Sequence, residues 1–271
     1  MPELPEVETT RRGIEPQLLG VRVAGVVVRR ADLRQPVTPS LAAIVGRRVT
    51  AVRRRAKYLL LDIDDGSTLL IHLGMSGSLR VAMAGQPWKP HDHIAITLAS
   101  GRQLRFHDPR RFGLVLRLTG DARTHPLLEN LGPEPLEEDF TVAGLAAACA
   151  RRPAAIKQVI MDARVVVGVG NIYASEALFR AGIRPRTAAR RIAQPRLARL
   201  VAAIRAVLTE SIAAGGTTLR DFVHSAGEPG YFKQRLFVYG REGAACQVCG
   251  TAIRRAVLGQ RATYWCPHCQ R

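Results

Sequence analysis

The first eight residues, MPELPEVE, combine a potential amine nucleophile with three carboxylates. A small second residue favours removal of Met1, which would leave Pro2 as a terminal secondary amine. Terminal amines titrate near about 7.7–8.0, so a useful fraction is deprotonated at neutral pH. Such an amine can attack carbon at the aldehyde oxidation level and form an iminium, while a neighbouring acid such as Glu3 moves protons. The segment is therefore a candidate for covalent catalysis.

The same segment also fits an ordinary helix start. Pro5 suits the first turn of a helix, and Glu6 and Glu8 suit the positive end of the helix dipole. This interpretation explains the two glutamates but gives no purpose to Pro2 or Glu3. Both interpretations stay open on the sequence of this segment alone.

Two Cys-x-x-Cys pairs lie near the C-terminus, formed by Cys246, Cys249, Cys266 and Cys269. Each pair can give two thiolates to one ion, and four thiolates complete a tetrahedral site without an open position. The pattern predicts one structural Zn²⁺ that holds together a segment too small for its own core. Disulfides and a substitute ligand at His268 are the alternatives. The fifth cysteine, Cys149, lies in an alanine-rich stretch typical of a core.

The charge balance is far from neutral, with 40 Lys and Arg against 22 Asp and Glu and a net charge of +18. Such a field favours a polyanion, with DNA or RNA ahead of an anionic membrane surface; a generic basic surface is the plain alternative. No apolar run reaches the roughly 18 residues of a membrane span. The acidic N-terminus differs from a secretory signal, which predicts a cytoplasmic protein.

Lysine is rare in this arginine-rich chain and occurs only at Lys57, Lys89, Lys157 and Lys233. A lysine that persists in such a composition is a candidate for a role that needs a compact ammonium. Lys57 follows three arginines and enters an apolar run, where it could reach a phosphate; a charged strand end is the alternative. Lys157 is the second candidate.

Short β-branched or alternating runs fill the first half and predict a β-sandwich or barrel behind a helix over residues 5–19. The predicted strands are 21–29, 48–52, 58–63, 68–72, 94–98, 103–106 and 114–118. A Pro-rich stretch at 131–135 then marks a linker. Helical periodicity follows over residues 142–150, 154–161, 174–181 and 195–213. Residues 215–232 form a long segment with little periodicity, as functional loops often do.

Two further constellations have both a functional and a plain explanation. Gly168, Gly170 and Asn171 precede a predicted helix and could cradle a phosphate, or Asn171 could simply cap that helix. Met75 and Phe112 are apolar residues in Gly-flanked turns, typical of wedges that enter base stacks, or of ordinary packing. The histidines show no convincing metal spacing.

Taken together, these motifs resemble the bacterial formamidopyrimidine-DNA glycosylase family, which excises oxidised purines from DNA. The resemblance runs from end to end. It includes PELPEVET at 2–9, RRAKYL at 54–59, HLGMSG at 72–77, DPRRFG at 108–113, VGVGNIYA at 167–174, GGTT at 215–218, GYF at 230–232, VYGR at 238–241 and the four cysteines.

The resemblance implies roles for individual residues. Pro2 would attack the sugar C1′, with Glu3 as acid and base and Glu6 as support. The phosphates around the lesion would be held by Lys57, Lys157, Asn171 and Arg261. Two of these residues, Lys57 and Arg261, would also count among the catalytic residues. Met75, Arg110 and Phe112 would fill the gap left by the flipped base, with Arg110 facing the orphaned cytosine. His91 and Tyr239 would contact DNA, and residues 216–231 would cover the extruded base.

The resemblance also implies an α+β fold in three domains. These are an N-terminal β-sandwich with its N-terminal helix over residues 1–132, a helix-two-turns-helix domain over 133–235 and a zinc finger over 236–271. The expected partner is double-stranded DNA that contains oxidised purines or abasic sites, the expected cofactor is one structural Zn²⁺, and the expected state is a monomer without membrane association.

The implied reaction is glycosylase and AP lyase chemistry through a Pro2 iminium, followed by β- and δ-elimination. Two alternatives remain. The sister glycosylase for oxidised pyrimidines, endonuclease VIII, uses the same amine and finger, although Leu4 and the Met75, Arg110 and Phe112 set favour the purine branch. A non-catalytic zinc DNA-binding protein would explain the charge and the cysteines but not Pro2 and Glu3.

Overall fold

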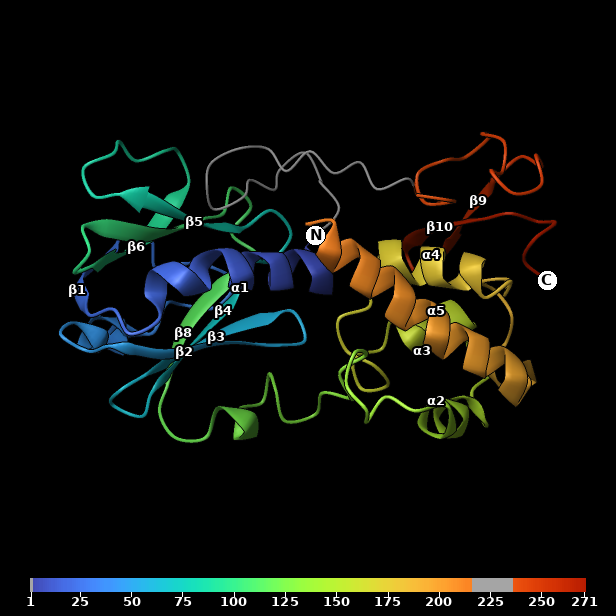
Figure 1. Cartoon of the computed structure of the whole chain (residues 1–271), viewed down its shortest axis with the longest axis horizontal. Coiled ribbons are helices and arrows are strands. Elements are labelled where there is room, and N and C mark those ends of the chain that lie inside the picture. Colours follow the sequence, from blue (N-terminus) through green and yellow to red (C-terminus); the bar gives the residue numbers. More distant parts are fainter. Residues whose placement is uncertain (1, 216–235) are drawn as a thin grey trace. The chain divides into compact units, whose positions relative to one another are not determined.

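The computed structural model describes residues 2–215 and 236–271, and these form two compact units (Figure 1). The first unit contains residues 2–129, and the second contains residues 130–214 and 236–271. Among the described residues, no helix is long and apolar enough to cross a membrane.

Helix α1 (Leu4–Leu18) opens the first unit and places the N-terminal residues. Its buried residues Leu4, Val7, Ile14 and Leu18 recur at helical spacing and form one apolar stripe. This stripe packs against strands β2 and β5 (Figure 1). The predicted helix is therefore confirmed, with a start one residue earlier than expected.

Two antiparallel four-stranded sheets build the sandwich of the first unit. One sheet has the order β2 (Val49–Arg55), β3 (Tyr58–Ile63), β4 (Thr68–His72) and β8 (Leu114–Leu118). The other has the order β1 (Val23–Val28), β6 (Asp92–Leu98), β7 (Arg102–His107) and β5 (Ser78–Met83). Both sheets and α1 contribute to one apolar core, which confirms the predicted sandwich. Two short 3-10 turns, η1 (Pro39–Ile44) and η2 (Ala122–Thr124), lie in the connections.

The second unit is mainly helical. It contains α2 (Val142–Cys149), α3 (Ile156–Ile160), α4 (Asn171–Arg180) and α5 (Gln194–Ala213), with a short 3-10 turn η3 (Ala189–Arg191). Helix α5 packs on α2 and α4, and α3 packs on α4 (Figure 1). Cys149 is buried at 2% exposure, which confirms its expected place in a core.

A β-hairpin completes the second unit near the C-terminus. Its strands are β9 (Arg254–Leu258) and β10 (Arg261–Trp265), and β10 packs against α4. A small apolar cluster joins Phe179 of α4 to Val238, Ile253 and two cysteines. Neither this hairpin nor strand β5 is among the elements predicted from the sequence.

Candidate functional site

The N-terminal end of α1 holds the candidate amine residue beside two buried carboxylates. The backbone N–H of Glu3 donates to Glu6 Oε2 at 2.8 Å, as one half of a capping box that also occupies the Glu3 side chain. Glu3 is 3% and Glu6 1% exposed, and Pro2 is buried as well. The structure therefore brings Pro2, Glu3 and Glu6 together. It also shows that the helix-start interpretation is right for Glu6.

Glu8 joins α1 to the hairpin that carries Lys57. Its Oε2 lies 3.2 Å from Arg54 Nε, and Arg54 also donates to the carbonyl of Ala56 at 3.0 Å. Ala56 has a φ of +53°, a left-handed conformation that completes the tight β2–β3 turn before Lys57. Burial works to raise the pKa of Glu8, but hydrogen bonds from Arg11 and other arginines outweigh it and leave the pKa lowered. Glu8 is therefore an ionised anchor for this hairpin.

Met75 and Phe112 lie in two turns that are in close contact. Gly74, with a φ of +66°, lies so close to the backbone of Phe112 and Gly113 that a Cβ at position 74 would overlap it. The Phe112 side chain is 46% exposed, and Arg110 lies over its ring at 5.6 Å. Met75 is half-buried. Ordinary packing thus does not explain Phe112, and the structure brings Met75, Arg110 and Phe112 into one surface region of the first unit.

Asp108 fixes the two turns to each other. Its Oδ2 accepts from the Gly113 backbone N–H at 2.7 Å, and its Oδ1 accepts from the Ser76 hydroxyl at 3.2 Å. The His93 ring nitrogen Nε2 lies 2.8 Å from the Asp108 carbonyl oxygen. Asp108 is fully buried. One carboxylate therefore holds both the Met75 turn and the Phe112 turn.

His72 supports the Met75 turn from strand β4. Its Nδ1 accepts from the Gly74 backbone N–H at 3.0 Å, which requires an unprotonated nitrogen. Burial, with smaller contributions from Arg34 and Lys57, lowers the pKa of His72 to about 4. The ring is therefore neutral near neutrality, as this hydrogen bond demands.

His91 lies on the surface in a left-handed conformation, with a φ of +68°. Its ring centroid is 6.2 Å from that of His93 and 6.1 Å from that of His107. Its carbonyl accepts from the Asp108 N–H at 3.0 Å. A non-glycine residue in this conformation is uncommon and is held here by its neighbours.

Lys157 and Asn171 converge on strand β10 in the second unit. Lys157 is 1% exposed, and its Nζ donates to the Ala262 carbonyl at 3.1 Å and to Thr263 Oγ1 at 2.8 Å. Asn171 Nδ2 donates to the same carbonyl at 3.0 Å. The exposed residue Arg261 directly precedes Ala262. The structure therefore brings Lys157, Asn171 and Arg261 together. The alternative in which Asn171 caps α4 is wrong, because Gly170 occupies the cap position.

Glu176 holds the segment that contains Tyr239. Its carboxylate accepts from three successive backbone N–H groups, those of Phe237 at 2.8 Å, Val238 at 3.0 Å and Tyr239 at 2.9 Å. Glu176 itself is 3% exposed. Three donors on one buried carboxylate fix the backbone at Tyr239, whose ring also contacts the ring of Tyr264 edge-on at 5.2 Å.

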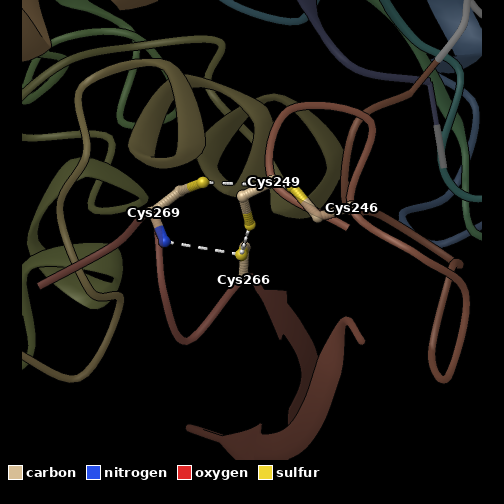
Figure 2. Close-up of side chains that lie close together, drawn as sticks. All are labelled: Cys246, Cys249, Cys266 and Cys269. Carbon is tan, nitrogen blue, oxygen red and sulfur yellow. Dashed lines mark hydrogen bonds between the residues drawn. The ribbon is translucent and has the colours of Figure 1, made fainter. Parts of the chain in front are cut away.

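The four cysteines of the predicted metal site point toward one another (Figure 2). Their sulfur atoms all lie within 4.8 Å of one another; Cys249 and Cys266 are 3.4 Å apart, and Cys246 and Cys269 are 4.0 Å apart. Four sulfurs at about 2.3 Å from a tetrahedral zinc ion would be about 3.8 Å apart, so the geometry fits. No histidine joins this group among the described residues, which leaves His268 outside the ligand set.

The donor chemistry also fits a cation. Hydrogen bonds from Thr251 lower the pKa of Cys249 to about 6, whereas burial raises the pKa of Cys266 and Cys269. Four adjacent thiols therefore do not all ionise without a counter-charge, which a divalent ion supplies. The residues form a site for one structural Zn²⁺, and the predicted cofactor is confirmed.

Comparisons with known proteins agree along the chain. The model of the formamidopyrimidine-DNA glycosylase N-terminal domain matches residues 1–115, and that of the H2TH domain of the same enzymes matches residues 131–223. The model of a zinc finger found in FPG and IleRS matches residues 243–271. A formamidopyrimidine-DNA glycosylase of Thioalkalivibrio sulfidiphilus is 59% identical over 272 residues, which is 100% of both chains. The chain belongs to the formamidopyrimidine-DNA glycosylase family.

Solved structures of this family have the same fold. The MutM (Fpg) protein of Thermus thermophilus matches with a TM-score of 0.88 at 43% identity, over 99% of this chain and 98% of that one. The Lactococcus lactis Fpg, in complex with DNA that contains an abasic site, matches with a TM-score of 0.91 at 31% identity, over 99% of both chains. The predicted family and α+β fold, including the helix-two-turns-helix domain, are thereby confirmed.

Sequence reasoning for this family member missed the buried carboxylates that hold the candidate residues in place. Asp108 lies inside the DPRRFG motif and Glu176 lies two residues beyond VGVGNIYA, but neither was assigned a role. The DPRRFG motif offered one signal, since an Asp four residues before Phe112 was available as an acceptor. The partners of Glu176 lie more than 60 residues away and left no local pattern. The predicted cover over residues 216–231 lies outside the described residues.

Proposed function

We propose that this chain is a bifunctional base-excision repair enzyme. As a glycosylase it removes oxidised purines, namely 8-oxoguanine and formamidopyrimidines, from duplex DNA. As a lyase it then cuts the abasic strand. The observation that carries this proposal is the placement of Pro2 and Glu3 at the buried start of α1, in a chain that matches glycosylases of this kind along its full length. The enzyme works on DNA in the cytoplasm as a monomer.

The proposed chemistry begins at the Pro2 nitrogen once Met1 has been removed. This nitrogen forms a bond to the sugar C1′, and the bond from C1′ to the damaged base breaks with its electron pair on the base, which is protonated. Glu3 protonates the ring oxygen, so the sugar opens and C1′ becomes part of an iminium. The iminium acidifies C2′–H; β-elimination then expels the 3′ phosphate, and δ-elimination expels the 5′ phosphate. A one-nucleoside gap remains.

The other candidate residues bind and shape the DNA in this proposal. Lys57 in the first unit, and Lys157, Asn171 and Arg261 in the second, hold phosphates around the lesion. The Ala262 carbonyl already gathers Lys157 and Asn171 beside Arg261, which supports a shared phosphate site. His91 and Tyr239 make further DNA contacts, Glu6 supports the amine site, and the zinc ion supplies no chemistry beyond holding the β9–β10 hairpin.

Met75, Arg110 and Phe112 fill the space that the flipped nucleotide leaves in the stack, with Arg110 facing the orphaned cytosine. Flipping costs a few kcal/mol of unstacking, which inserted side chains offset in part. The contact between the two turns and the exposure of Phe112 support this role. For the domains we propose boundaries at 1–132, 133–235 and 236–271.

Borohydride trapping tests the proposal. The protein, shown by intact mass to lack Met1, should form a covalent adduct with duplex DNA that contains 8-oxoguanine opposite cytosine. Glu3→Gln should slow base removal by about 100-fold or more while DNA affinity is kept. The absence of an adduct with Met1-free protein that still binds this DNA would leave only a zinc-containing DNA-binding protein.

Oxidised pyrimidines are the substrates of the competing glycosylase class. Excision rates on 8-oxoguanine opposite cytosine and on thymine glycol duplexes separate the two. We expect the purine lesion to be removed faster by at least about tenfold. A preference for thymine glycol would reassign the chain to the pyrimidine branch.

A further inference from the structure

A cavity of about 410 Å³ opens beside the turn that carries Arg110. Two of its lining residues lie side by side on adjacent strands, because Ser78 of β5 pairs with His107 of β7. The polar side chains that line it are Ser76, Ser78, Arg80, Lys89, His107 and Arg110. No acidic side chain lines the cavity among the described residues.

The positive charges around this cavity exceed the negative ones. The fully buried Asp92 does not line the cavity, but it binds Arg80 through both carboxylate oxygens and lies 3.7 Å from Arg105. One carboxylate thus faces two guanidinium groups. Burial lowers the pKa of His107, so this ring is neutral near neutrality. Within the described part of the chain, neither Lys89 nor Arg110 forms an ion pair. The cavity is therefore a positive site, in which Asp92 balances part of the charge and Lys89 and Arg110 add to it without a carboxylate partner among the described residues.

Lys89 stands on a loop that is fixed before any ligand arrives. Arg105, at 1% exposure, donates to the carbonyls of Pro87 at 2.9 Å and Gln86 at 2.6 Å. The Trp88 ring lies 5.1 Å from the same guanidinium. The backbone N–H of Lys89 donates to Asp92 at 2.9 Å. Both sides of Lys89 are held, so only its side chain must be ordered on binding, which lowers the entropic cost.

We propose that this cavity binds a backbone phosphate of the DNA strand opposite the lesion, with the Lys89 ammonium as its main charge. The assignment rests on the proposed function, in which Arg110 faces the orphaned base of that strand. Since Arg110 lines the same cavity, the backbone next to the orphaned base passes its mouth. Ser78 also lines the cavity, and a serine hydroxyl can donate a hydrogen bond to a phosphate oxygen. A phosphate with several waters fits in about 410 Å³, because one water occupies about 30 Å³.

The test measures the affinity of full-length Lys89→Ala for a duplex with an uncleavable abasic analogue opposite cytosine, over a range of salt concentrations. We expect binding to weaken about tenfold near 0.1 M salt and the slope of log K against log salt to become shallower by about 0.9. Arg123→Ala is the matched control. Like Lys89→Ala, it removes one exposed positive charge from the first unit, but Arg123 lies outside the cavity, so this variant should keep the wild-type slope.

Uncharged methylphosphonates identify the strand. Their placement beside the orphaned cytosine should weaken the wild type but add no further loss to Lys89→Ala. Their placement in the lesion strand should weaken both proteins equally. The proposal is overturned if Lys89→Ala keeps the wild-type affinity and salt slope. It is also overturned if the difference in affinity between the wild type and Lys89→Ala disappears only when the methylphosphonates lie in the lesion strand. This binding test needs no chemical reaction, whereas borohydride trapping tests the covalent step of the proposed function. A failure of one proposal can therefore be told apart from a failure of the other.

Discussion

The turn around Phe112 and the β9–β10 hairpin both present arginines, but they are held by different means. The Phe112 turn rests on a sandwich with a large apolar core, and one buried carboxylate, Asp108, fixes it. Strand β9 of the hairpin is largely exposed, and the hairpin packs with a small apolar cluster that includes the cysteines. Where the core is large, hydrogen bonds suffice to fix a turn; where it is small, metal coordination takes their place.

Loss of the zinc ion should give the largest effect of the changes considered. This effect should be confined to the β9–β10 hairpin and leave the turn around Phe112 intact. Cys266→Ala removes one of four zinc ligands, and structural zinc sites contribute about 10–16 kcal/mol to the folding of small fingers. We expect loss of bound zinc and a decrease in DNA affinity of about 100-fold, because Arg261 and Ala262 lose their support. Metal analysis and equilibrium binding to an abasic-analogue duplex measure both quantities.

Cys149→Ala is the control for this prediction, since Cys149 is a buried cysteine outside the cluster. It should retain one zinc ion and wild-type DNA affinity. A Cys266→Ala protein with full zinc occupancy and unchanged affinity would contradict the metal-based half of the comparison.

Removal of the carboxylate from the sandwich side should have the next largest effect. Asp108→Ala leaves the buried Gly113 N–H without its acceptor, and the Ser76 hydroxyl without its partner. We expect a loss of about 2–4 kcal/mol in the free energy of unfolding. Excision should slow by about 100-fold, because the Met75 and Phe112 turns are no longer fixed together. Urea denaturation and single-turnover kinetics measure the two effects, and zinc content should stay at one ion.

Asp64→Ala is the matched control, since Asp64 is an exposed carboxylate in the same unit. Its free energy of unfolding should stay within about 0.5 kcal/mol of the wild type. If Asp108→Ala were as stable and as fast as this control, Asp108 would have no role in holding the turns.

Acidification should produce a smaller effect in the sandwich. The pKa of His72 is about 4 in the folded protein against an ordinary 6.5, so between these values the unfolded chain binds more protons. The contribution of His72 to stability is therefore complete above about pH 6.5 and decreases as the pH falls toward 4, by at most about 3 kcal/mol. Urea denaturation at pH 7 and pH 4.5 measures this decrease.

His72→Asn sharpens the result, because an Asn oxygen can still accept from the backbone N–H two residues later but does not titrate. Its stability should depend less on pH than that of the wild type. Protons also compete with zinc for the cysteines, so zinc content must be followed in both proteins. Equal pH dependence in the two would exclude His72 as the titrating group.

The candidate residues that sequence could find are those whose chemistry depends on near neighbours. Pro2 and Glu3 are adjacent, and the paired cysteines have a spacing that itself encodes the ligand geometry. The strand at Tyr58–Ile63 was predicted with its observed bounds because its apolar run ends in clear turn residues. In these cases the local pattern and the tertiary structure agree.

Elements that depend on distant partners escaped prediction. Strand β5 contains Arg80, a buried charge that is tolerated only because Asp92 of another strand binds it. Strand β9 is short, charged and exposed, and its hairpin belongs to the small cysteine-containing cluster rather than to a large apolar core. Asn171 looked like a helix cap, but its side chain reaches Ala262, 91 residues along the chain. Each depends on a contact that local periodicity does not encode.

The close approach of Gly74 to the backbone at Phe112 and Gly113 has a thermodynamic consequence for the proposed base extrusion. Two loops in direct backbone contact behave as a single rigid insert, so their relative freedom has already been given up when the polypeptide folds. Three side chains on separate loops would each have to be immobilised when the helix is opened. In the proposed complex, the gap left by the flipped nucleotide is filled by two turns that are already fixed to each other. DNA binding therefore does not have to order these turns relative to one another, and that entropic cost is avoided.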